Sequence, residues 1–160
     1  MTGKELLNTI RRERLKLEKL KKEHREEKKY FQVLRAVDYE RAFVSGGRVS
    51  TLDDVIERQE AEQERYIRRF EFVYSSYCAY LTQAWELVDD AIEADWGTGP
   101  GLIYMLEYYS HDLTYKQLAT KTPFKEGYLR ALIQRSAKQF EKMYRARYPP
   151  PRTRTRQEKR

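Results

Sequence analysis

The chain has 160 residues, a formal net charge of +7 and 36% charged side chains. Its longest uncharged stretch, residues 72–85, is shorter than the roughly 18 apolar residues that a membrane span needs. Arginines and a glutamate follow Leu6, Leu7 and Ile10 too closely for a secretory signal. We therefore expect a cytoplasmic protein with no membrane partner, and because Cys78 is its one cysteine and it has two histidines, we expect no disulfide within the chain, no metal and no cofactor.

The first predicted element is a long helix over about residues 3–38. Thr2 and Glu5 have the spacing of a capping box, and the segment that follows lacks proline and is rich in Leu, Lys, Arg and Glu. Its apolar residues follow a heptad register of the coiled-coil type, but two glutamates and His24 occupy seam positions of that register. The pattern favours a helix that packs on a neighbour over an autonomous coiled coil.

A second long helix is predicted over about residues 51–95, after a loop that contains Gly46 and Gly47. It has two apolar stripes, which predict two packing neighbours. One stripe contains Tyr66, Phe70, Val73, Tyr77 and Ala84, and the other contains Ile67, Tyr74, Leu81 and Val88. The first neighbour is expected to be the preceding helix, which gives a long helical hairpin over residues 1–96. The second is expected to be the C-terminal module or a second subunit, so this hairpin is interpreted as the part that forms a homodimer or binds host RNA polymerase.

The C-terminal part has the pattern of shorter helices. A glycine-rich linker over residues 97–101 leads to a predicted domain over 102–146. Within it, Thr114 is placed to cap a short helix, Pro123 stops that helix, and a further helix is predicted over about 124–144. Two helices joined by a tight turn are typical of a helix-turn-helix unit. The fold class is therefore all-α: a long N-terminal helical hairpin, a C-terminal helix-turn-helix domain and a disordered basic tail over 147–160.

Charge is distributed unevenly between these parts. Residues 39–112 carry a net charge of −9, whereas residues 113–160 carry +11. Any pair of short amphipathic helices gives the pattern described above, and a helical hairpin of no special purpose is the alternative interpretation. Because basic side chains lie on the expected outer face of the last helix, the pattern favours a nucleic-acid partner.

The sequence from Leu113 to Phe140 resembles, without a gap, the helix-turn-helix of sigma factor region four, and residues 106–109 suit the helix that precedes it. The wider arrangement resembles phage late transcription activators of the RinA and ArpU kind. The resemblance implies that four residues face the bases of a promoter element, of which the arginine suits a bidentate contact to guanine. These residues are Glu126, Gly127, Arg130 and Ala131. Pro123 departs from the resemblance, because the turn usually has glycine there and proline cannot take a positive φ.

The candidate DNA contacts come from both helices and from the tail. They are Thr114, Tyr115, Lys116, Lys125, Glu126, Tyr128, Arg130, Gln134, Arg135, Lys138, Arg152, Arg154 and Arg156. The last three alternate after a run of prolines, which is typical of an extended arm that enters a minor groove or follows phosphates. A solubilising tail is the alternative.

The expected function is that of a sequence-specific DNA-binding transcriptional regulator, a phage late-gene activator that acts on double-stranded DNA at promoters with host RNA polymerase. Two other classes remain open: a DNA-packaging subunit of the small terminase kind, and a helical adaptor without DNA specificity. We expect no enzymatic activity, because the sequence has no Ser/His/Asp arrangement, phosphate-binding glycine loop or distinct carboxylate pair.

Overall fold

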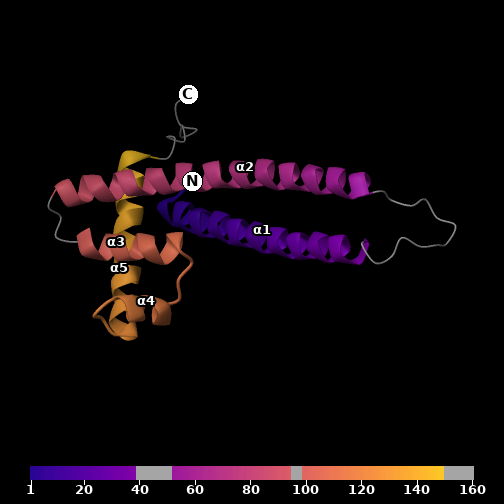
Figure 1. The fold of residues 1–160 in the computed structure, drawn as a ribbon. Coiled ribbons are helices and arrows are strands. Elements are labelled where there is room, and N and C mark those ends of the chain that lie inside the picture. The colour runs from indigo at the N-terminus through magenta and orange to yellow at the C-terminus, as the bar shows by residue number, and fades with distance from the viewer. Residues whose placement is uncertain (39–51, 95–98, 150–160) are drawn as a thin grey trace, which may run out of the picture. The chain divides into compact units, whose positions relative to one another are not determined.

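The computed structural model describes residues 1–38, 52–94 and 99–149, with side chains described from 1–32, 54–94 and 99–149. These residues form helices without any strand, which confirms the all-α class (Figure 1). In chain order the helices are α1 (Gly3–Asp38), α2 (Leu52–Glu93), α3 (Gly99–Ser110), α4 (Tyr115–Lys121) and α5 (Glu126–Arg147).

The bounds of α1 and α2 agree with the predicted helices over 3–38 and 51–95. The capping box that starts α1 is present, because the Thr2 N–H donates to Glu5 Oε2 at 2.7 Å and the Glu5 N–H donates to Thr2 Oγ1 at 3.1 Å. Both bonds satisfy amides near the helix start, where amides have no partner within the helix. The local sequence therefore suffices to define where α1 begins.

The described residues divide into compact units at other positions than the predicted linker. One unit comprises residues 1–11 and 79–160, and the other comprises residues 12–78. The division runs through α1 and α2, since the first turns of α1 and the last turns of α2 contribute side chains to the unit that contains the C-terminal helices. Residues 99–101 of the predicted linker belong to α3, which begins at Gly99.

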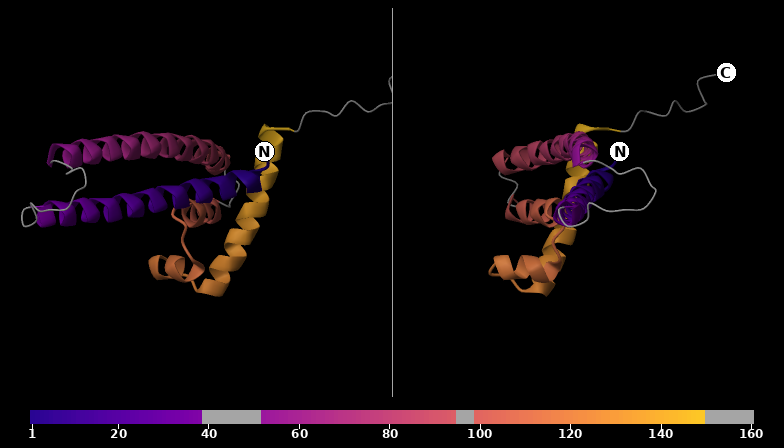
Figure 2. Two further views of the ribbon diagram at one scale, coloured as in Figure 1. Left: turned by 90° about the vertical axis from the view of Figure 1, so that its right-hand side faces the viewer. Right: turned by 45° about the vertical axis from the view of Figure 1, so that its right-hand side comes forward.

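In the unit of residues 12–78, segments of α1 and α2 lie side by side and run in opposite directions (Figure 2). Leu17, Leu20 and Val55 are buried in this unit. The His24 ring stacks on the Tyr66 ring, with centroids 3.9 Å apart and planes at 7°. His24 therefore occupies the α1–α2 contact, which is the seam position predicted for it.

The two apolar stripes of α2 differ in burial within this unit. Tyr77 of the first stripe is buried, and Tyr66 of the same stripe is half-buried against α1. By contrast, Ile67 and Tyr74 of the second stripe are 43% and 50% exposed, and the neighbouring Phe72 is 75% exposed. The structure supplies the neighbour predicted for the first stripe, and it leaves these members of the second stripe at the surface.

The other unit has its core where α3 and α4 pack on α5. Figure 2 shows both shorter helices along α5, with α4 near the N-terminal end of α5. The fully buried side chains of this unit come from each of its helices. They include Leu6, Leu7, Ile10, Val88, Leu102, Met105, Leu106, Leu118, Leu129 and Phe140.

Gly101 fixes how closely α3 approaches α5. A Cβ atom on this residue would lie 2.6 Å from Ser136 Oγ and 3.1 Å from Leu132 Cδ1. Only glycine permits this approach without a shift of its neighbours. The glycine that was assigned to the linker is therefore part of the α3–α5 contact.

Glu141 of α5 connects the first turn of α1 to the same unit. The backbone N–H of Lys4 donates to Glu141 Oε2 at 2.8 Å, and Arg145 Nε donates to Glu141 Oε1 at 2.5 Å. Burial alone raises the pKa of Glu141, but the bonds from Arg145, Lys4 and Gly3 outweigh burial, and the pKa lies below its ordinary value. The carboxylate thus sits at the positive end of α1, which favours its charged form.

Candidate nucleic-acid interface

The start of α4 is defined by a capping box at Thr114, the residue that the sequence predicts as the cap. Thr114 Oγ1 accepts from the backbone N–H of Gln117 at 3.2 Å, and the Thr114 N–H donates to Gln117 Oε1 at 2.8 Å. Leu118 is fully buried, which orients the short helix. The Thr114 hydroxyl, a candidate DNA contact, is thereby engaged in capping its own helix, while the neighbouring Lys116 side chain is exposed.

The turn between α4 and α5 is extended. Thr122 has φ −128° and ψ 158°, as expected for a residue before proline, and its hydroxyl donates to the carbonyl oxygen of Leu118 at 3.1 Å. Among the described residues the positive φ of a non-glycine residue occurs at Asp112, before α4, and not in this turn. Proline at position 123 is therefore compatible with this turn. The next helix starts two residues later than expected, at Glu126.

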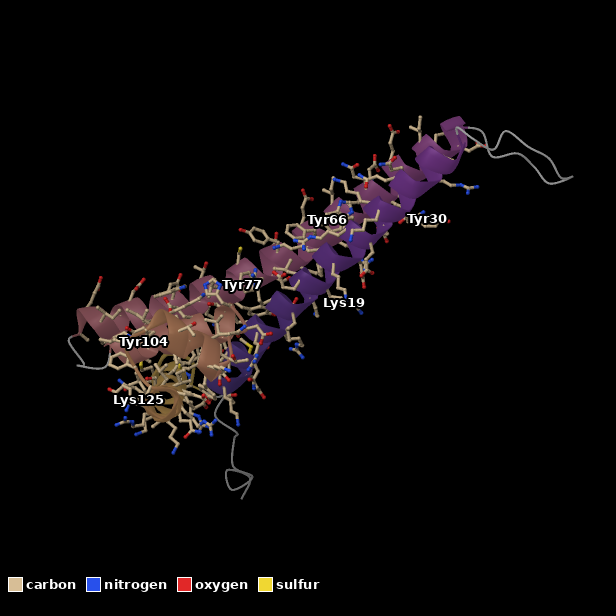
Figure 3. The ribbon with its side chains drawn as sticks, turned by 60° about the horizontal axis from the view of Figure 1, so that its bottom comes forward. Lys19, Tyr30, Tyr66, Tyr77, Tyr104 and Lys125 are labelled. Atoms are coloured by element: carbon tan, nitrogen blue, oxygen red, sulfur yellow. The ribbon has the colours of Figure 1, made fainter. Side chains whose placement is uncertain are left out.

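Phe124 anchors the end of this turn on α3. Its ring lies edge-on to Tyr104, with centroids 5.9 Å apart, and tilted against Tyr128 at 5.0 Å. Figure 3 shows Tyr104 and Lys125 in this unit, with nitrogen-tipped side chains around Lys125. Tyr128, a candidate DNA contact, is 49% exposed on one side of α5 while its ring contacts Phe124.

The two faces of α5 differ as its sequence predicts. Leu129, Ile133 and Phe140 are buried. The candidate contacts on this helix and at its start are all exposed. They are Lys125, Glu126, Tyr128, Arg130, Gln134, Arg135 and Lys138. Gly127 and Ala131 are also exposed, and a Cβ atom at Gly127 would meet no heavy atom within 4 Å. The outer face of α5 therefore combines small residues with basic and polar side chains.

Arg130 is held from two sides. Its Nη2 lies 3.4 Å from Glu126 Oε1, one helical turn earlier. Its guanidinium carbon lies 5.3 Å from the ring centroid of Tyr115, which is the distance of a cation–π contact. The two partners leave the guanidinium partly exposed, with 58% of the side chain accessible. The Arg130 guanidinium, the candidate guanine contact, is therefore positioned by Glu126 and Tyr115 and remains accessible to a ligand.

The stack continues behind Tyr115 into α3 and α1. The rings of Tyr115 and Tyr108 are nearly parallel, with centroids 4.8 Å apart and planes at 16°. The guanidinium carbon of Arg11 in turn lies 5.3 Å from the Tyr108 centroid, and Arg11 forms an ion pair with Asp112. Burial lowers the pKa of Arg11, but hydrogen bonds to Asp112 and Tyr108 outweigh burial and raise it, which keeps this cation charged.

Some members of this stack could be predicted from the sequence and others could not. Arg130 and Tyr115 were candidate contacts, and the structure brings them together. Arg11 and Tyr108 were missed, because no local pattern connects the first turns of the chain to a helix about a hundred residues later. The candidate contacts in the tail, Arg152, Arg154 and Arg156, lie outside the described residues.

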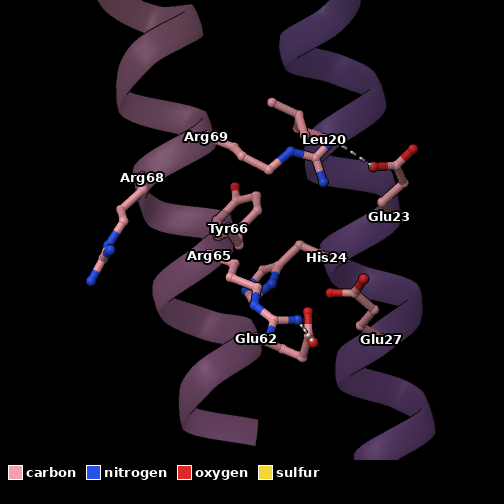
Figure 4. A pocket seen from close by; sticks show the side chains of 9 residues that line it. All are labelled: Leu20, Glu23, His24, Glu27, Glu62, Arg65, Tyr66, Arg68 and Arg69. Carbon is pink, nitrogen blue, oxygen red and sulfur yellow. Dashed lines mark hydrogen bonds and ion pairs between the residues drawn. The ribbon is translucent and has the colours of Figure 1, made fainter. Parts of the chain in front are cut away.

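Away from this stack, a groove lies between α1 and α2 in the unit of residues 12–78 (Figure 4). It contains arginines, but each has a carboxylate partner: Arg65 with Glu62 at 2.6 Å, Arg69 with Glu23 at 4.0 Å, and Arg68 with Glu64 at 3.2 Å. Three arginines and three glutamates line this groove, so their charges balance, whereas the exposed candidate contacts of α5 and its start include four basic side chains and one glutamate. The candidate interface is therefore α4 and α5.

Among the residues that the structure describes, no helix is long and apolar enough to cross a membrane, and no group of three or more His, Cys, Asp and Glu side chains could hold a metal ion. Comparison of the chain with protein-family models, with curated proteins and with solved structures gives no match.

Proposed function

We propose that this protein is a sequence-specific DNA-binding transcriptional regulator, in which α4 and α5 act as a helix-turn-helix and α5 enters the major groove. The sequence resemblance to phage late transcription activators supports a more specific proposal, that the protein is a phage late-gene activator that works at promoters with host RNA polymerase. The proposal has no catalytic step and needs no cofactor.

The observation that carries the proposal is the outer face of α5. The major groove of B-DNA is wide enough to admit an α-helix, and small side chains on the contact face permit a close approach. Gly127 and Ala131 lie on the exposed side of α5 with basic residues around them, and the opposite side is fixed by buried Leu129 and Ile133. A helix packed in this way presents one rigid face to a ligand.

Arg130 is the proposed base-reading residue. A bidentate arginine–guanine contact contributes roughly 1–3 kcal/mol of discrimination against other bases. Glu126, which holds Arg130 at 3.4 Å in the free protein, remains one turn away and is able to accept from a cytosine amino group. Lys116, Lys125 and Lys138 are assigned to phosphates, which position the helix without reading sequence.

The long helices are assigned to protein partners. A helix face with Ile67 and Tyr74, seven residues apart and both exposed, supports a second contact for α2. A homodimer through this face would match the two-fold symmetry of a palindromic site, and host RNA polymerase is the other proposed partner. The basic tail, with Arg152, Arg154 and Arg156, is proposed as an arm that follows DNA.

The test compares binding of duplex DNA by the intact protein and by two variants with one basic side chain removed. Arg130→Ala should lose discrimination between preferred and random duplexes, whereas Lys138→Ala should weaken binding to both equally. Uniform loss in Arg130→Ala would make Arg130 a phosphate contact. No duplex binding at low salt would contradict the whole proposal and favour the helical adaptor, and a ring of eight or more subunits in a mass measurement would favour the packaging subunit.

A further inference from the structure

We infer that Tyr115 is a positioning residue that sets how selectively Arg130 reads its base, and that it does so as part of a stack that begins at Arg11. This inference rests on the proposed function, and it changes the role of Tyr115 from a DNA contact to a support for one. Its basis is the order of the stacked groups in the unit that contains α3, α4 and α5.

The stack has a cation at each end and two tyrosine rings between them. Arg11 lies 5.3 Å from the Tyr108 centroid, the two rings are 4.8 Å apart, and Arg130 lies 5.3 Å from the Tyr115 centroid. Each aromatic ring is therefore in contact with one cation and with the other ring.

The two arginine side chains at the ends of the stack differ in how firmly they are held. Arg11 is fixed by its ion pair with Asp112, while Arg130 ends in solvent with Glu126 beside it. Tyr115 is half-buried and follows the Thr114 cap directly, so its backbone is fixed by the start of α4. A rigid ring at this position limits where the Arg130 guanidinium can go.

Restricting Arg130 affects discrimination more than affinity. An arginine side chain loses rotamer freedom when it forms a two-bond contact, and a guanidinium that is already held in plane loses less of it. The same restriction disfavours the reorientation that would let Arg130 bind a neighbouring phosphate in place of a base. Without the ring, Arg130 still supplies charge to any DNA, so non-specific binding should change little.

The first experiment measures competition between a selected duplex and a random duplex for the full-length protein, with Tyr115→Leu and Tyr115→Phe. An exposed cation–π contact corresponds to about a two- to fivefold effect. We expect Tyr115→Leu to lower the preference for the selected duplex by about that factor and Tyr115→Phe to retain it, because phenylalanine keeps the ring. The control is Lys116→Ala in the same helix, which should weaken binding to both duplexes and leave their ratio unchanged.

A second experiment uses no DNA. Nuclear magnetic resonance of the Arg130 side-chain Nε–H should show a ring-current shift in the wild type and in Tyr115→Phe, and lose it in Tyr115→Leu. An unshifted wild-type signal would overturn the stack itself. A shifted signal together with equal loss of selected and random binding in Tyr115→Leu would overturn the positioning role. If the shift is present and the protein binds no duplex, the proposed function fails although the stack is real.

Discussion

The closeness of α3 and α5 at Gly101 makes a defined prediction about stability. In Gly101→Ala, the new methyl carbon would lie 2.6 Å from Ser136 Oγ and 3.1 Å from Leu132 Cδ1 if nothing moved. The first distance is shorter than real Cβ contacts, and Ser136 is buried, so either the serine must rotate within the core or α3 must move away from α5.

The expected magnitude is the difference between two effects. Forcing an extra methyl group into a packed contact costs about 1–3 kcal/mol. Alanine in a helix is favoured over glycine by about 0.5–1 kcal/mol, which offsets part of that cost. We therefore expect the free energy of unfolding to fall by about 1 kcal/mol, which for a chain of this size lowers the melting temperature by about 2–4 °C.

The assay is thermal and urea unfolding followed by circular dichroism, with Gly127→Ala as the matched control. The control makes the same chemical change in α5, where a Cβ atom would meet nothing within 4 Å, so it should leave stability unchanged or raise it by up to about 1 kcal/mol. If Gly101→Ala is as stable as the wild type, or if the two variants are equally destabilised, the close α3–α5 contact is refuted.

Three further predictions follow from individual contacts. Thr114→Ala removes the cap of α4 and should destabilise the protein by about 0.5–2 kcal/mol, measured by urea unfolding; an unchanged midpoint would refute the capping role. Because the pKa of Glu141 is lowered on folding, its contribution is present above its ordinary pKa and is lost as the pH falls through the lower, folded value. Glu141→Gln should therefore be less stable than the wild type at neutral pH, and the gap should close on acidification; a gap that persists in acid would contradict this linkage. If the full-length protein neutralises about six phosphates, the slope of log affinity against log salt should be near −5. Deleting residues 150–160, which leaves α5 intact, should make this slope shallower. An unchanged slope would remove the tail from the interface.

Much of the helical structure could be predicted because its signals are local. The capping boxes at Thr2 and Thr114 and the stop before Pro123 lie within a few residues of the helix ends that they define. The expected outer face of the last helix is likewise exposed, and the opposite face, with Leu129 and Phe140, is buried. Such signals depend on backbone hydrogen bonding and side-chain spacing, which are the same in any fold.

The contacts that the sequence did not predict join residues far apart in the chain. Glu141 reaches the amide of Lys4, and Arg11 reaches Tyr108 and Asp112. Nothing in the spacing of these residues indicates that they meet, because the meeting depends on how whole helices pack. For the same reason the sequence placed a domain boundary after α2, whereas the compact units divide within α1 and α2.

The central claim, that α5 reads DNA sequence through Arg130, is tested most directly by selecting bound duplexes from a random pool with the full-length protein and with Arg130→Ala. The account predicts that the wild type enriches a motif containing a preferred guanine, and that the preference at that base is lost in the variant while the rest of the motif persists. Recovery of DNA with no motif by the wild type, or an identical motif with both proteins, would contradict it.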